Sequence, residues 1–108
     1  SFQEMPKKIA TEYLEWISSF ETYFFTKNAM GKYDPQEIDL KIKNESQYKS
    51  VLKMGLLTEK FRIFDDEKKV DLEKKYLHVF CPKNFSLLKT SRGFGQYLSY
   101  QLALYESN

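Results

Sequence analysis

The sequence predicts an α+β fold in which long N-terminal and C-terminal helices pack on a small, mostly antiparallel sheet. Apolar residues recur at three- and four-residue steps near both ends of the chain, which is typical of helices with one buried face. Two runs between them, KFRIF (60–64) and YLHVFC (76–81), have the composition of strands. Helices and strands do not alternate regularly, which argues against a parallel sheet, and 108 residues fit one domain, 1–108.

Residues 5–30 are predicted to form the N-terminal helix. Pro6 suits a first helical turn, and Gly31 is a natural stop. The apolar stripe that predicts this helix consists of Ile9, Tyr13, Trp16, Ile17, Phe20 and Phe24. Tyr23 and Phe25 fall beside the stripe, so its apolar face widens towards the C-terminal end and favours contact with more than one neighbour.

Residues 37–43 carry two conflicting signals. Asp34, Pro35 and Glu37 are typical of a helix start, with a cap, a first-turn proline and a capping-box acid. The apolar residues of 38–42, however, alternate strictly with charged ones, as in a half-buried strand. We favour the strand because the alternation spans the whole segment.

The second half of the chain is predicted to contain one helix, two strands and the C-terminal helix. Asn44 caps a helix that begins near Glu45. The highly charged segment 66–75 then joins the two strands as a turn of helix or a hairpin loop, and 83–90 is predicted to be loop. Ser91 caps the last helix, whose apolar face is formed by Phe94, Leu98, Leu102 and Tyr105.

Charge and composition bound the class of protein. The net charge of +2 is too small to indicate a polyanion partner by itself. The chain has fifteen lysines but only two arginines, which argues against sequence-specific recognition of DNA. This preference for lysine is also typical of proteins encoded by an AT-rich genome, for example that of a phage or mobile element. The single cysteine, Cys81, is expected to be a small buried apolar residue. Without an apolar run long enough for a membrane span or a visible secretory signal, we expect a cytoplasmic protein with no membrane contact.

The aromatic content carries the main functional prediction. Aromatic residues make up 17% of the chain, and several of them gather in 13–25. Large aromatic side chains dominate the centres of protein interfaces. We therefore predict a non-enzymatic interaction or regulatory protein, which forms a homodimer or binds a protein partner through Trp16, Phe20, Phe24 and Phe25.

A nucleic-acid-binding regulator is the alternative prediction. In a winged-helix arrangement, 45–57 would be the recognition helix and the two predicted strands would form the wing. Basic residues interleaved with aromatics also suit binding of single strands. The predicted nucleic-acid-binding residues are Lys49, Lys53, Lys83, Lys89 and Arg92.

Two short stretches resemble known motifs. Asp39-Leu40-Lys41 resembles the acid–x–lysine tripeptide of the PD-(D/E)XK nucleases, in which the acid helps to hold Mg²⁺. Segment 92–95 (RGFG) resembles the opening of the RNP1 motif of RNA-recognition motifs, but Gln96 and Ser99 stand where its further aromatics belong. His78 and Cys81 supply two soft ligands where structural zinc needs four. We therefore expect no catalytic site, no cofactor and no metal.

Overall fold

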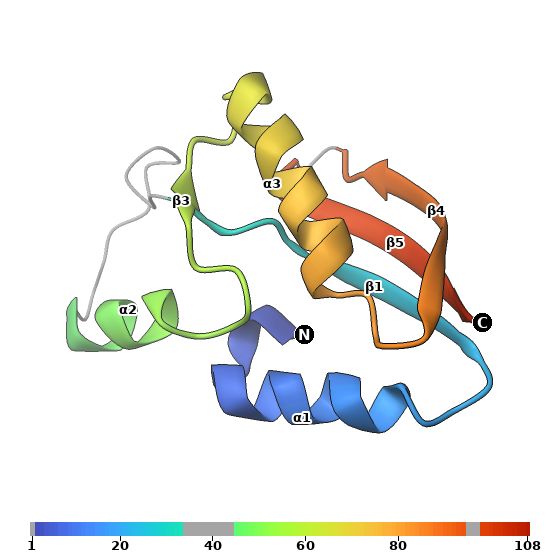
Figure 1. Ribbon diagram of the computed structural model, residues 1–108. Helices are drawn as coiled ribbons and strands as arrows, with labels where there is room; N and C mark the ends of the chain where they lie inside the picture. The colour runs from blue at the N-terminus through green and yellow to red at the C-terminus, as the bar shows by residue number, and fades with distance from the viewer. Residues whose placement is uncertain (1, 34–44, 95–97) are drawn as a thin grey trace.

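The structure is a computed structural model, and it describes residues 2–33, 45–94 and 98–108. Helices and strands are mixed, and they form two layers (Figure 1). In chain order the elements are the 3-10 helix η1 (Phe2–Glu4), α1 (Lys7–Ile17), β1 (Tyr23–Ala29), β2 (Lys32–Tyr33), α2 (Glu45–Leu52), β3 (Lys60–Phe61), α3 (Asp66–Val79), β4 (Phe85–Arg92) and β5 (Tyr100–Ser107).

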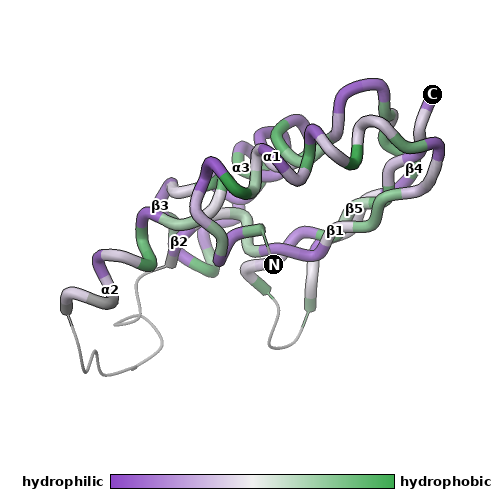
Figure 2. Tube along the Cα trace, turned by 90° about the horizontal axis from the view of Figure 1, so that it is seen from below, coloured by the Kyte–Doolittle hydropathy of each residue, from purple (hydrophilic) through white to green (hydrophobic). Residues whose placement is uncertain are grey.

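The larger sheet has three antiparallel strands in the order β1-β5-β4, so the last strand of the chain lies in the centre. Strands β2 and β3 form a separate parallel pair of two residues each. Helices α1 and α3 lie on the same side of the three-stranded sheet, as Figures 1 and 2 show from two directions. The predicted α+β class with a small antiparallel sheet is therefore confirmed, whereas the long terminal helices are not observed.

The core lies between α3 and the inner face of the sheet. Its main cluster consists of Leu57, Tyr76, Phe80, Phe85, Ala103 and Tyr105. The ring of Tyr76 in α3 lies 4.5 Å from that of Phe80, the residue that caps the C-terminal end of this helix, and Phe24 of β1 stacks on Tyr105 of β5 at 6.3 Å. Phe2 joins the two groups, because its ring centroid lies 5.9 Å from those of both Phe24 and Phe80. Rings from three parts of the chain thus share one apolar centre.

Tyr76 also satisfies polar groups of the sheet. Its buried hydroxyl donates to Thr26 Oγ1 at 3.0 Å and accepts from Asn28 Nδ2 at 3.3 Å. Burial raises the pKa of the Tyr76 hydroxyl, although these two hydrogen bonds oppose that shift. The side chains of Thr26 and Asn28 are buried on β1, so without this hydroxyl their polar atoms would lose a partner.

A buried glutamine fastens the N-terminus to the segment before β3. Gln3 donates from Nε2 to the Leu57 carbonyl at 2.7 Å and accepts from the Leu57 amide at 3.0 Å through Oε1. Gly55 has φ +86°, and a Cβ there would lie 2.6 Å from the Gln3 Cα. Only glycine combines this backbone conformation with so close an approach.

The predicted N-terminal helix ends at Ile17, and its second half is a strand. The Ser18 and Ser19 hydroxyls donate to the carbonyls of Glu15 and Trp16 in the last turn, where carbonyls have no intrahelical partner further along the chain, and the Ser19 amide also donates to the Trp16 carbonyl at 3.2 Å. Residues 23–29 then pair with β5 along their whole length. The prediction was wrong over 18–30 because the four-residue step from Phe20 to Phe24 happens to continue the helical stripe.

The predicted strand YLHVFC is also wrong, because 76–79 forms the last turn of α3. The charged segment 66–75 and this apolar run make one helix, in which Leu72, Tyr76 and Phe80 recur every four residues towards the core. Asp65 caps the helix by accepting from the Lys68 amide at 3.1 Å. The buried face of this helix has only one apolar residue per turn, and the many charged residues of 66–75 hide that periodicity in the sequence.

The C-terminal prediction is wrong in both of its parts. Segment 85–92, predicted largely as loop, is strand β4, and the predicted last helix contains strand β5. Asn84 adopts φ 66° in the turn that leads into β4, a conformation that asparagine tolerates better than most residues. The alternation in β5 is weak in the sequence because Leu102 and Leu104, which face away from the core, are as apolar as the inward-facing Ala103 and Tyr105.

The helix predicted near Glu45 is confirmed as α2, whereas only Lys60–Phe61 of the predicted strand 60–64 is paired. Residues 37–43, with the Asp39–Lys41 triplet, lie outside the described residues, as does Asn44.

We predict that Tyr76→Phe lowers the free energy of unfolding by about 1–3 kcal/mol, because it removes a hydrogen-bond partner from buried polar atoms of Thr26 and Asn28. Chemical denaturation followed by circular dichroism measures the change. Tyr23→Phe is the matched control, since Tyr23 is 63% exposed, and it should leave stability unchanged. Equal effects of the two substitutions would contradict this role of the Tyr76 hydroxyl.

Candidate functional site

The first exposed apolar surface lies along α1. Four side chains form it, and we call them the α1 aromatic surface: Ile9, Tyr13, Trp16 and Phe20, which are 40%, 45%, 61% and 44% exposed. Trp16 and Phe20 contact each other edge to face, with ring centroids 4.9 Å apart. The surface thus continues from the helix into the turn that follows it.

This surface exists because the apolar arc of α1 is wider than the body of the protein covers. Ala10 is fully buried and Ile17 packs against the core. With successive residues about 100° apart, Ile9, Tyr13 and Trp16 fall on the neighbouring arc, between the buried residues and the polar side that carries Glu12 and Glu15. The sequence predicted the apolar stripe that contains these residues, but Ile9 and Tyr13 were not among the predicted partner-binding residues.

The size of the α1 aromatic surface is consistent with an interface. At these exposures the four side chains present on the order of 400 Å² of accessible area. That area is similar to the largest apolar patch of a typical monomer, which is often functional. It is about half of what one partner contributes to an interface of standard size, so neighbouring polar side chains would supply the remainder.

The structure brings together only two of the four predicted partner-binding residues. Trp16 and Phe20 are neighbours on the α1 aromatic surface. Phe24 is partly buried against Phe2 and Tyr105 in the core. Phe25 is 59% exposed, but it is adjacent to Phe24 on a strand and therefore points to the opposite face of the sheet.

Phe25 belongs to a second exposed surface, the face of the three-stranded sheet opposite α1 and α3. Figure 2 shows the helices on one side of β1, β5 and β4 and no described element on the other side. We call this the open sheet face. By strand alternation and register its members are Tyr23, Phe25, Lys27 and Ala29 of β1, Tyr100, Leu102, Leu104 and Glu106 of β5, and Ser86, Lys89 and Ser91 of β4. Leu102 and Leu104 were missed because their segment was assigned to a helix.

The predicted nucleic-acid-binding residues are dispersed over the molecule. Lys49 lies on α2 and Lys53 follows its end, whereas Lys83 lies in the turn before β4, and all three are exposed. Lys89 lies on the open sheet face. Arg92 donates from Nε to Glu73 Oε2 of α3 at 3.1 Å, an ion pair that fastens the end of β4 to the helix layer.

The winged-helix arrangement does not occur, because the second of its two wing strands is part of α3. Segment 92–94 of the RNP1-like stretch leaves the end of β4, which is an edge strand in the described part of the chain. Phe94 is 85% exposed there.

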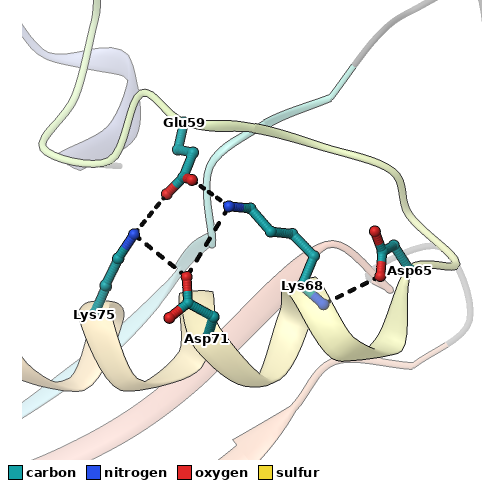
Figure 3. Close-up of polar contacts among 5 residues, drawn as sticks. All are labelled: Glu59, Asp65, Lys68, Asp71 and Lys75. Atoms are coloured by element: carbon teal, nitrogen blue, oxygen red, sulfur yellow. Dashed lines mark hydrogen bonds and ion pairs between the residues drawn. The ribbon is translucent and has the colours of Figure 1, made fainter.

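A cluster of four charged side chains between α3 and the segment before β3 has a structural role. Glu59 accepts a hydrogen bond from Lys68 and another from Lys75 at 2.9 Å, and Asp71 pairs with Lys75 at 3.3 Å (Figure 3). The hydrogen bonds from Lys68 and Lys75 hold the pKa of the Glu59 carboxyl below its usual value. Two acids and two lysines neutralise each other in this network, which holds the segment before β3 on α3.

The remaining titratable groups with shifted pKa values are engaged in packing. Burial lowers the pKa of Lys32, whose ammonium donates to the Gln3 carbonyl at 3.1 Å. Partial burial raises the pKa of the Cys81 thiol, which donates to the Phe85 carbonyl at 3.3 Å and is therefore a poor nucleophile. Within 2–33, 45–94 and 98–108, no group of three or more His, Cys, Asp or Glu side chains is placed to hold a metal ion.

Comparisons with models of protein families, with curated proteins and with solved structures found no match to this chain. In the described part of the chain, no helix combines the length and the apolar character needed to cross a membrane.

The Glu59 network predicts a small pH-dependent contribution to stability. Folding lowers the pKa of Glu59, so its ion pairs stabilise the protein at pH values above 4.5, the ordinary pKa of this carboxyl. The stabilisation is lost as the pH falls through the folded-state pKa. The Glu59 side chain is 40% exposed, so we expect Glu59→Gln to cost less than about 1 kcal/mol at pH 7.

The measurement is the free energy of unfolding of the wild type and of Glu59→Gln between about pH 3 and pH 7, the range in which carboxyl groups titrate. The difference between them should shrink below the ordinary pKa of Glu59. Glu12→Gln, which changes an exposed acid of α1 outside this network, provides the control. A difference that stays constant across the range would mean that Glu59 acts through packing alone.

Proposed function

We propose that this chain is a non-enzymatic interaction module that binds a second protein chain through the α1 aromatic surface. A single observation carries the proposal, namely that Ile9, Tyr13, Trp16 and Phe20 lie side by side and remain between 40% and 61% exposed. Covering these side chains removes apolar area from water, which is the main driving force of protein association. Trp and Tyr are also the residues that most often dominate binding energy at interfaces.

The charges beside this surface support a protein as the bound partner. Glu12 and Glu15 occupy the adjacent polar side of α1 together with Lys8, and Glu21 follows Phe20 in the exposed turn, so these four groups carry a net negative charge. An apolar strip with an acidic margin has the anatomy of an interface core with a polar rim. Acidic margins would repel a polyanion, so the α1 aromatic surface favours a protein over a nucleic acid.

The single tryptophan of the chain reports directly on this contact. We predict that Trp16 fluorescence shifts to shorter wavelength when the partner covers α1, because the indole leaves water. If the partner is a second copy, the shift depends on protein concentration and accompanies a doubling of mass by light scattering. If the partner is another protein, the wild-type chain stays monomeric and retains that protein during purification from its native host.

The decisive variant is Trp16→Glu, which places a charge at the centre of the surface without disturbing the core. It should abolish the dimer or the retained complex, a loss of at least about 100-fold in affinity. Glu67→Gln, which changes an exposed acid of α3 outside this surface, should leave association within about threefold of the wild type. The proposal fails if Trp16→Glu forms every complex that the wild type forms.

A further inference from the structure

The open sheet face presents an apolar floor between two cationic edges. Two rows of paired residues cross its three strands from β1 through β5 to β4. One row is Phe25, Leu104 and Lys89, and the next is Lys27, Leu102 and Ser91. Residues paired across antiparallel strands point to the same side, so the leucines form the centre and the lysines lie on opposite edges.

A shallow hollow of about 220 Å³ lies across these rows. Phe25, Lys89, Ser91, Leu102 and Leu104 are among the residues that line it. Pockets that hold a whole small molecule usually enclose about 300–1,000 Å³. This hollow therefore has room for one flat group of a larger ligand, with the 59% exposed Phe25 ring beside it.

The spacing of the lysines indicates an extended anionic ligand. Strands lie about 4.8 Å apart and alternate residues about 6.8 Å apart, which places the Lys27 and Lys89 Cα atoms about 12 Å from each other on a diagonal. Lys89 is exposed and forms no ion pair within the described residues. A chain crossing the sheet on this diagonal meets an ammonium group on each side of the apolar floor.

We propose that the open sheet face binds single-stranded nucleic acid. One base occupies the hollow and stacks on Phe25, while a backbone phosphate contacts the ammonium of Lys89 and Lys27 adds positive charge at the opposite edge. Stacking on an aromatic side chain combined with flanking cations is the physical basis of binding that does not depend on base sequence. This mode agrees with a chain rich in lysine and poor in arginine, since the bidentate reading of bases that arginine provides is not required.

One acid on the same face opposes the ligand. Glu106 lies one row beyond Leu104, paired with Tyr23 on one side and Ser86 on the other. Its Cα lies about 7 Å from that of Leu104 along the strand, so its negative charge weakens the positive potential beside the hollow. Removal of this charge should therefore strengthen binding, which a merely structural role of Glu106 would not predict.

The test measures the fluorescence anisotropy of labelled oligothymidine, oligouridine and a DNA duplex with the full chain at low salt. We expect both single strands to bind more tightly than the duplex, with affinity falling as salt rises. Phe25→Ala should weaken binding about tenfold. Lys89→Gln should weaken it several-fold and reduce the salt slope by about one unit, and Glu106→Gln should strengthen it.

Two controls separate this site from other effects. Lys74→Gln removes an exposed lysine from α3, on the helix side of the sheet, and should leave affinity nearly unchanged. Trp16→Glu alters the α1 aromatic surface and should leave it unchanged as well, so that the two proposals fail or succeed independently. We expect the variants to remain folded, because Phe25 and Lys89 lie outside the core. Thermal unfolding of each variant checks this.

Three results would overturn the proposal. The first is the absence of binding to either single strand at low salt. The second is binding that Phe25→Ala leaves intact and that Lys74→Gln weakens as much as Lys89→Gln, which would indicate diffuse charge attraction. The third is a dimer that Phe25→Ala dissociates, which would make the open sheet face a contact between protein chains. A preference for oligothymidine over oligouridine, or the reverse, identifies which single strand the face accommodates.

Discussion

Tyr76 connects the helix layer to the sheet through both parts of its side chain. Its ring packs on Phe80 in the centre of the core, while its hydroxyl bonds two buried polar side chains of β1. Because Thr26 and Asn28 lie inside, α3 can leave the sheet only if these polar atoms lose their partner. This contact orients β1 and thereby decides that Phe24 faces the core and Phe25 faces away.

The two-layer arrangement also explains why so much aromatic surface remains exposed. Helices α1 and α3 cover one face of three strands, and the described residues place no third layer on the other (Figure 2). The helix layer itself is one helix thick, so the apolar arc of α1 is covered only on its inner side. Two surfaces of different character result, since Glu12 and Glu15 border the α1 aromatic surface whereas lysines edge the open sheet face.

The open sheet face accounts for two of the segments in which the sequence misled prediction, 23–29 and 100–107. An outward-facing residue on an ordinary two-layer sheet is polar, and the resulting alternation reveals the strand. In β5 the outward positions include Leu102 and Leu104, and in β1 they include Tyr23 and Phe25, so the period of two is obscured. The features that make these strands candidates for binding are the ones that made them resemble helices.

Local periodicity in the sequence was sufficient for the helix beginning near Glu45 and for the aromatic strip from Ile9 to Phe20, because each depends on residues close together along the chain. The α+β class was also predicted, but from 60–64 and 76–81, whereas the strands of the larger sheet lie at 23–29, 85–92 and 100–107. Only the tertiary structure decided that 23–29 and 100–107 pair as neighbouring strands and that Phe24 and Phe25 separate to opposite faces. Pairing partners more than seventy residues apart are selected by the energy of the assembled core, which no local window of sequence contains.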